Sequence, residues 1–264
     1  MPLRITNRPA NTDGKVLILM YHKFGAHESR YTRTYNHFWN DLDRLYKMGF
    51  RPVTIREYAD NKMNLPPGSS PVVLTFDDAH PSQLRFLKDG SIDPNCAVAI
   101  WQKFAKLHPD FPVKGVFYVV TTMMWAQPKL VDKKIELLKS LGSQVSNHTM
   151  HHPFLNKCSD EKARKEIAGA AVYLTKHHVD GADFALPYGA FPRNHALTKQ
   201  FKYNGKIYTN TTVALAGDCP APSPTNKHFN RYRIPRVIGQ NEYNGIETWL
   251  KRIQAGKVSL YVAP

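Results

Sequence analysis

The stretch Pro71-Val-Val-Leu-Thr-Phe-Asp-Asp78 joins an apolar run to two adjacent carboxylates. A continuous apolar run of this length is typical of a strand that is covered on both faces, as in a parallel sheet. Two carboxylates at the exit of such a strand are costly unless water, hydrogen bonds or a cation compensates them. An ordinary turn, in which Asp side chains bind backbone N–H groups, explains the same residues. The stretch alone leaves both interpretations open.

Strand-like runs and helical periodicity alternate on both sides of this stretch. Upstream, Lys15–Phe24 predicts a buried strand, and apolar residues at i, i+4 and i+7 predict a helix over Asn36–Met48 that Gly49 closes. The other predicted strands are Arg51–Ile55, Gly115–Thr121, Gln144–Asn147, Asp183–Pro187, Ile207–Val213 and Arg233–Ile238, and the other helices are Asn95–Leu107, Val131–Leu141, one capped by Ser159, and Tyr243–Gln254. About seven such strand–helix units predict an α/β fold with an irregular, nearly closed (β/α) barrel.

We expect one domain over residues 15–264, preceded by an N-terminal extension over residues 1–14. No low-complexity linker divides the chain, and the Pro-rich stretch Gly217–Pro224 is predicted to be a surface loop. The longest apolar run, Val16–Tyr21, is too short to span a bilayer. Residues 1–14 lack the apolar core of a secretory signal.

The charge balance is unusual. The chain has 36 Lys and Arg against 21 Asp and Glu, a formal net charge of +15. Such a surface attracts polyanions, which include nucleic acids, acidic membranes and anionic cell-wall polymers. Because no basic tract or nucleic-acid-binding motif is present, we expect no nucleic-acid partner.

The cysteines lie far apart without a CxxC pair and are predicted to be free, buried thiols: Cys96, Cys158 and Cys219.

A second polar motif, Ser146-Asn-His-Thr-Met-His-His152, follows another predicted strand. His148 and His152 are four residues apart, so one helical turn would place both imidazoles on the same face. Two imidazoles and one carboxylate form a familiar ligand set for catalytic zinc, which keeps a position open for water. An isolated HxxxH is more often a pair of surface histidines. Its position at a strand end, like that of Asp77 and Asp78, favours a shared site.

A third motif, Phe184-Ala-Leu-Pro-Tyr-Gly189, also runs from a strand into a turn. Pro187 and Gly189 fix an irregular backbone, which could direct a backbone N–H into the site. An ordinary β-turn is the simpler interpretation of this hexapeptide taken alone.

The three motifs, in this order, resemble those of the polysaccharide deacetylase family, the NodB-homology carbohydrate esterases, over about residues 15–240. The resemblance implies an irregular (β/α) barrel that binds one divalent metal, usually zinc. It implies that Asp77 is the general base and that the metal ligands are Asp78, His148 and His152. It also implies that the Pro187–Tyr188 segment supplies a backbone N–H to the oxyanion site.

The chain departs from the family pattern at three places. Ala185 replaces the usual arginine before the Pro-Tyr-Gly segment, so Asp77 is expected to lack its usual tether. Arg233 and Arg236 occupy roughly the place of a later Asp-containing motif, and they are candidates to orient Asp77 or to bind substrate. The late motif with a catalytic histidine is missing from residues 258–264. We therefore predict that His22, at the end of the first strand, is the general acid.

The leading hypothesis is a metal-dependent hydrolase that removes acetyl groups from N-acetylglucosamine units of a polysaccharide. Its positive charge favours peptidoglycan over poly-N-acetylglucosamine and chitin-like chains, although the Ala-x-Pro-Tyr-Gly form resembles the poly-N-acetylglucosamine subgroup. A wall substrate implies a secreted, periplasmic or cell-wall location. The alternatives are a carbohydrate-binding relative without turnover and a two-metal phosphodiesterase. The sequence leaves the oligomeric state open, with a monomer as the default.

Overall fold

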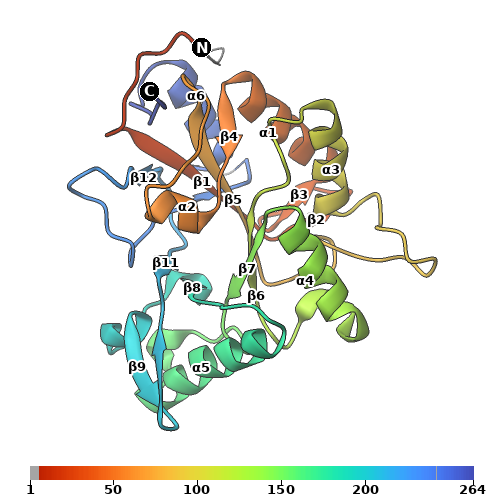
Figure 1. Ribbon diagram of the computed structural model, residues 1–264, viewed down its shortest axis with the longest axis vertical. Coiled ribbons are helices and arrows are strands. Elements are labelled where there is room, and N and C mark those ends of the chain that lie inside the picture. The colour runs from red at the N-terminus through yellow and green to blue at the C-terminus, as the bar shows by residue number, and fades with distance from the viewer. Residues whose placement is uncertain (1–5, 242) are drawn as a thin grey trace.

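The computed structural model, which describes residues 6–241 and 243–264, is built on a curled sheet of mainly parallel strands (Figure 1). The strands are β1 (Lys15–Tyr21), β2 (Lys23–Gly25), β3 (Thr32–Thr34), β4 (Phe50–Pro52), β5 (Ser70–Asp77), β6 (Val116–Val119), β7 (Gln144–Asn147), β8 (Asp183–Ala185), β9 (Gln200–Tyr203), β10 (Lys206–Thr209), β11 (Thr212–Ala214), β12 (Ala221–Pro222) and β13 (Val237–Ile238). The α-helices are α1 (Tyr35–Lys47), α2 (Ile55–Ala59), α3 (Ala97–Leu107), α4 (Val131–Ser140), α5 (Asp160–Lys176) and α6 (Ile246–Gln254).

The main sheet has the order β11-β8-β7-β6-β5-β1, and every pair of neighbours in this row is parallel. β4 pairs with the start of β5, and β13 pairs with β1, both in parallel. β12 also pairs with β1 but is antiparallel to it. Parallel neighbours bring all their carboxyl ends to one edge. The predicted α/β architecture is therefore confirmed, and this edge is where the motif residues meet.

Residues 234–238 connect the two ends of this row. The N–H of Ile234 donates to the carbonyl of Val213 in β11, and Val237 pairs with Leu19 of β1. One short segment thus bonds to both outer strands and brings the curled sheet close to a closed barrel. Pro235 and Arg236 lie between these two anchors, so the segment that closes the sheet also places the side chain of Arg236.

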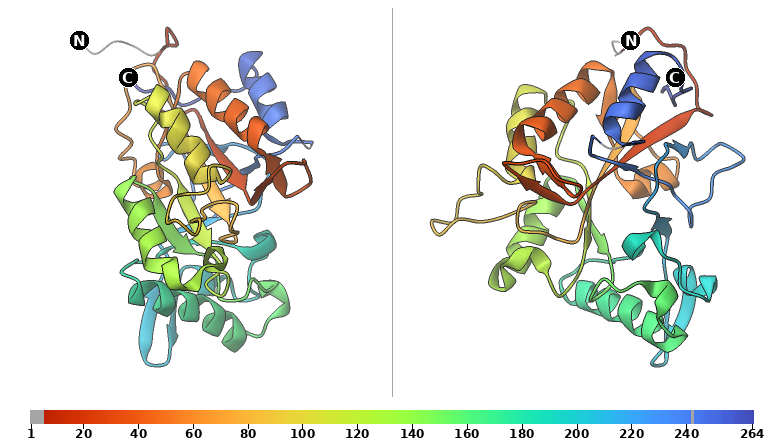
Figure 2. Two further views of the ribbon diagram at one scale, coloured as in Figure 1. Left: turned by 90° about the vertical axis from the view of Figure 1, so that its right-hand side faces the viewer. Right: turned by 180° about the vertical axis from the view of Figure 1, so that it is seen from behind.

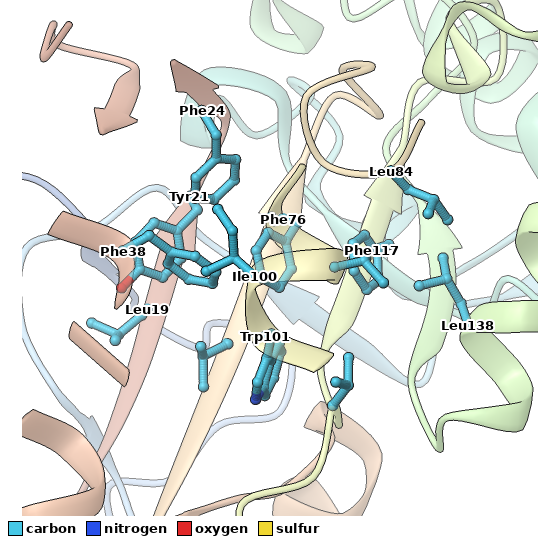
Figure 3. Close-up of a cluster of buried hydrophobic side chains, with 14 of the residues drawn as sticks. Leu19, Tyr21, Phe24, Phe38, Phe76, Leu84, Ile100, Trp101, Phe117 and Leu138 are labelled. Atoms are coloured by element: carbon cyan, nitrogen blue, oxygen red, sulfur yellow. The ribbon is translucent and has the colours of Figure 1, made fainter. Parts of the chain in front are cut away.

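The largest hydrophobic core lies between the sheet and helices α1, α3 and α4, which Figures 1 and 2 show along one side of it. Phe76 of β5 is central in the close-up of this core (Figure 3). Its ring stacks on Phe117 at a centroid distance of 4.6 Å and meets Trp101 of α3 at 6.2 Å. Fully burying one such aromatic ring contributes about 1.5–3 kcal/mol, so β5 is firmly held where its carboxyl end enters the site.

Most predicted helices and strands are present, and the residues predicted to begin or end the helices do so. Ser159 accepts from the N–H of Lys162 at the start of α5, and Gly49, at a φ of +81°, follows α1. The predicted strand Ile207–Val213 is wrong, because the chain forms a β9–β10 hairpin and then the separate strand β11. Asn204 and Gly205 both have positive φ at the hairpin tip, a two-residue turn that the Asn-Gly pair signals.

The chain around Gly217–Pro224 is less exposed than predicted. Ala221 and Ser223 are fully buried, because β12 pairs with the start of β1. Cys96 and Cys158 are free and buried as expected, whereas the Cys219 thiol is exposed, which corrects the prediction for this residue.

The described N-terminal residues pack against the chain end. Asn11 forms an antiparallel bridge with Val262, and Thr6 donates to the carbonyl of Gly68. A Cβ on Gly14 would lie only 2.1 Å from the backbone of Leu260, so this contact requires glycine.

Among the residues described, no helix has both the length and the apolar character needed to cross a bilayer.

Candidate active site

A pocket of about 520 Å³ opens at the carboxyl edge of the sheet. The strands place their polar residues around it: His22 follows β1, Asp77 ends β5 with Asp78 next after it, and His148 follows β7. Of the residues predicted for the site, those that line this pocket are His22, Asp77, Asp78, His148, His152, Tyr188 and Arg236. Pro187 belongs to the same turn as Tyr188 and is buried beside the pocket.

Three of these side chains converge on one point. The Nε2 atoms of His148 and His152 are 3.1 Å apart, and Asp78 Oδ1 lies 3.6 Å from the first and 3.4 Å from the second. Asp78 Oδ1 is buried and accepts no hydrogen bond within the described chain, which is costly for a carboxylate oxygen. A cation among these atoms would compensate it.

The spacing fits a small divalent cation with nitrogen ligands. Ligands about 2.0–2.1 Å from a tetrahedral zinc ion lie roughly 3.3 Å from one another, close to the three distances here. His148 Nδ1 bonds to the carbonyl of Ala185 at 2.8 Å, which orients the ring and directs Nε2 to the cluster. Burial lowers the pKa of His148 to about 3 and also lowers that of His152, so both imidazoles are neutral, the form that binds metals.

The two histidines reach this position in a way that differs from the prediction. Residues 148–152 form no helical turn; the chain bends sharply instead, with positive φ at Thr149 and His152. The side chain of Asn147 accepts from the N–H of Thr149, and the hydroxyl of Thr149 accepts from the N–H of His152. Local side chain–backbone bonds thus replace helical ones, as short polar residues often do.

Asp77 lies beside this cluster but has a different partner. The guanidinium of Arg236 donates from Nη1 to Oδ1 and from Nη2 to Oδ2 of Asp77, both at 2.7 Å. Arg236 is held in turn by the carbonyl of Leu215 and the hydroxyl of Thr75. The usual arginine is absent, since residue 185 is alanine, but Asp77 still has a tether. Arg236, one of the two arginines expected as candidates to orient Asp77, binds it from the closing segment.

This pair keeps Asp77 ionised. Burial opposes ionisation, but the Arg236 charge and hydrogen bonds outweigh it and hold the pKa of Asp77 well below its usual range. By contrast, burial raises the pKa of the adjacent Asp78. Asp77 Oδ2 is 3.8 Å from His148 Nε2, so an ionised carboxylate borders the three-residue cluster without belonging to it.

Three residues that line the pocket have a strained backbone. Asp78, His152 and Tyr188 all have positive φ, at 76°, 57° and 57°. Each such conformation costs on the order of 1–3 kcal/mol for a residue other than glycine, and it persists only where the surroundings enforce it. The strained residues belong to three different turns, and such conformations are common at functional sites.

His22 follows β1, the strand next to β5, and lines the same pocket. Its ring meets Tyr31 at a centroid distance of 5.0 Å, and burial lowers the pKa of His22. Gln83 holds its backbone: one amide nitrogen donates to the carbonyls of both His22 and Asp77, at 2.7 and 2.5 Å. This amide lies just beyond the last β1–β5 pair, Tyr21 and Phe76, and fixes the separation of the two strand ends.

Several pocket residues gave no signal in the sequence. Tyr31, Asp218 and Tyr243 line the pocket from loops that carry no recognisable motif. Tyr188 contributes more than backbone, because its ring stacks on Phe154 at 3.8 Å. Arg233 does not reach the pocket; it is exposed and lies over the ring of Phe191, so its predicted role at Asp77 is wrong.

The model of the polysaccharide deacetylase family matches residues 64–205, more than half of the chain. The chain belongs to this family. The match includes Asp77, Asp78, His148, His152 and Tyr188, but it ends before Arg236. The tether of Asp77 thus comes from outside the matched region.

Several solved structures share the fold. The deacetylase PplD of Streptococcus pyogenes has a TM-score of 0.67 at 19% identity, over 91% of this chain and 98% of PplD. IcaB of Ammonifex degensii has a TM-score of 0.63 at 18% identity, over 92% of this chain and 96% of IcaB. A de-N-acetylase of Aggregatibacter actinomycetemcomitans has a TM-score of 0.59 at 16% identity, over 89% and 99% of the two chains.

Proposed function

We propose that this polysaccharide deacetylase removes acetyl groups from N-acetylglucosamine units of a polysaccharide, using one divalent metal ion, zinc, held by Asp78, His148 and His152. The observation that supports this most strongly is the separation of two neighbouring carboxylates into different environments. Asp78 faces the two imidazoles with an unpartnered oxygen, whereas Asp77 is bound by Arg236. Hydrolysis of an amide needs both a Lewis acid and a free base beside it.

The pocket residues that do not bind the metal can each perform a step of the amide hydrolysis. A bound divalent metal would polarise the acetyl carbonyl and lower the pKa of water. Asp77, kept ionised by Arg236, accepts the proton of the attacking water. The backbone N–H of Tyr188, with Pro187 fixing its turn, donates to the oxyanion. His22, which lines the same pocket, would donate a proton to the departing amine; because burial lowers its pKa, it must first take up that proton from water.

We propose peptidoglycan as the substrate, ahead of poly-N-acetylglucosamine and chitin-like chains, and hence a location outside the cytoplasm. Lys23 and Arg30 line the pocket mouth, and the chain carries a net charge of +15. An anionic wall polymer is attracted to such a surface, whereas a deacetylated, cationic product is repelled.

The test is acetate release from peptidoglycan, poly-N-acetylglucosamine and chitooligosaccharides, with and without a chelator. Wild type should release acetate, and the chelator should abolish release until zinc is added back. His152→Ala should lose activity, whereas His228→Ala, a matched change at an exposed histidine outside the pocket, should not.

Two results would contradict the proposal. Polysaccharide binding without any acetate release from these substrates would identify a carbohydrate-binding relative. Two metals per chain would favour a phosphodiesterase; Asp78, His148 and His152 are the only metal-capable cluster of three or more among the described residues.

A further inference from the structure

A second hollow, of about 490 Å³, runs along α5 on the far side of the 148–152 turn. Its floor is one face of the helix, since the lining residues recur at helical spacing: Lys165, Ala168, Gly169, Val172, Tyr173 and Lys176. The small residues Ala168 and Gly169 lie in the middle, and a lysine lies at each end. From Lys165 to Lys176 the floor extends roughly 16 Å, a length suited to an extended chain.

The β9–β10 hairpin forms the other wall of this α5 groove. It packs against α5 at the end of the molecule opposite the termini (Figures 1 and 2). Tyr203 and Tyr208 of the hairpin line the groove together with Tyr173 of α5. Tyrosine rings present an apolar face and a polar tip, which suits the faces and hydroxyl groups of sugar rings.

The charge of the α5 groove has one sign. No carboxylate is among its lining residues in the described part of the chain. The sequence has no Asp or Glu from residue 184 to 217, a segment that includes the whole hairpin with Lys199, Lys202 and Lys206. A ligand that fits this surface carries negative charge.

The α5 groove also contacts the catalytic turn. Met150, between the two proposed metal ligands, lines the groove, and its Sδ would lie 2.0 Å from a Cβ added to Gly169. The hydroxyl of Thr122 donates to the carbonyl of Met150. The same turn thus presents His148 and His152 to the pocket and Met150 to the groove.

We propose that the α5 groove is a binding site for a carboxylate-bearing glycan strand, which holds a polymeric substrate beside the active site. The inference rests on the proposed function, because it assumes that the enzyme acts on a polymer. Lys165 and Lys176 bind carboxylates, and the three tyrosines contact the sugar rings.

The test uses a hyaluronan oligosaccharide, in which carboxylate-bearing sugars alternate with N-acetylglucosamine, as a binding probe for the full chain. Wild type should bind it, with an affinity that falls as salt is added. Lys165→Ala/Lys176→Ala should weaken binding by about threefold to tenfold, in keeping with two exposed charge contacts. Tyr203→Ala should weaken it as well.

The matched control is Lys106→Ala/Lys251→Ala, which removes the same charge from the exposed last turns of α3 and α6. This variant should bind the probe like wild type. Equal affinity in both double variants would overturn the proposal. Tighter binding of single-stranded DNA than of hyaluronan at the groove would overturn it too, in favour of a nucleic-acid surface.

Activity separates this inference from the proposed function. Lys165→Ala/Lys176→Ala should deacetylate a short, neutral chitooligosaccharide at the wild-type rate, because that ligand does not reach the groove lysines. If wild type released no acetate yet bound hyaluronan through these lysines, the proposed function would be wrong, whereas the proposal that the α5 groove binds glycan would be supported. If acetate were released but the groove variant bound normally, only the groove would fail.

Discussion

In the part of the chain that the structure describes, two arginine–aspartate pairs have both side chains buried, and they differ in what surrounds the carboxylate. Arg33 donates from Nε and Nη2 to Asp41 at 2.9 and 2.6 Å, much as Arg236 donates to Asp77. Asp41 also accepts from the hydroxyl of Tyr21, and it is a buried residue of α1. Asp77 instead borders the pocket and two imidazoles.

The comparison shows that an arginine clamp alone does not mark a catalytic carboxylate. The Arg33 clamp serves the fold: its Nη1 also binds Glu28 and Asn241 and so joins two loops. The Arg236 clamp leaves one side of Asp77 turned to the pocket. The first pair should therefore contribute to stability and the second to activity.

The largest effect should come from neutralising each carboxylate in turn. Asp77→Asn should reduce kcat/KM by about 10²–10⁴-fold, because a general base is lost. Asp41→Asn should leave kcat/KM per folded molecule unchanged and lower the free energy of unfolding by about 3–5 kcal/mol, since Arg33 remains buried without its counter-charge. Denaturant unfolding and acetate release on the same samples check both; loss of turnover in folded Asp41→Asn would remove the distinction.

A smaller effect should follow from shortening the clamp at Asp77. Arg236→Lys keeps the charge but cannot bind both carboxylate oxygens in the same plane. Because Asp77 then shifts within the site, kcat should fall by up to about 10²-fold with little change in KM. The matched variant Arg33→Lys should change stability alone, and a similar fall in kcat there would contradict the account.

Gln83 offers a third, weaker perturbation. Gln83→Leu removes the amide that bonds to the carbonyls of His22 and Asp77, and it should destabilise the fold by about 1–3 kcal/mol for each buried acceptor left unpaired. It should also lower kcat more than it raises KM, because base and acid lose their fixed separation. Gln254→Leu, at an exposed position in α6, is the control. An unchanged kcat would show that Gln83 is structural only.

The smallest effect should be at Arg233, three residues before Arg236. Its guanidinium lies over Phe191 at 4.6 Å on the surface. Arg233→Ala should cost about 0.5–1 kcal/mol of stability and leave acetate release intact. A large loss of activity would place Arg233, and not Arg236 alone, at Asp77.

The sequence predicted the strands and the residues at their carboxyl ends, because apolar runs and local motifs are encoded in short windows. It named Arg233 and Arg236 as candidates to orient Asp77 but could not choose between them, because the Arg236–Asp77 bond joins residues 159 positions apart and depends on how the sheet closes. The 148–152 turn was mispredicted because spacing alone suggested a helix, whereas Asn147 and Thr149 bend the backbone. The Asn204–Gly205 hairpin was a local signal that was overlooked, and the Gln83 contacts had no local signal at all.

The central claim is that Asp78, His148 and His152 hold one metal ion while Asp77 does not. Titrating zinc into the metal-free protein by calorimetry tests it most directly, with four single variants beside wild type. Wild type and Asp77→Asn should each bind one ion per chain, and Asp78→Asn, His148→Ala and His152→Ala should bind far more weakly or not at all. Loss of the ion from Asp77→Asn, or its full retention in Asp78→Asn, would contradict the account.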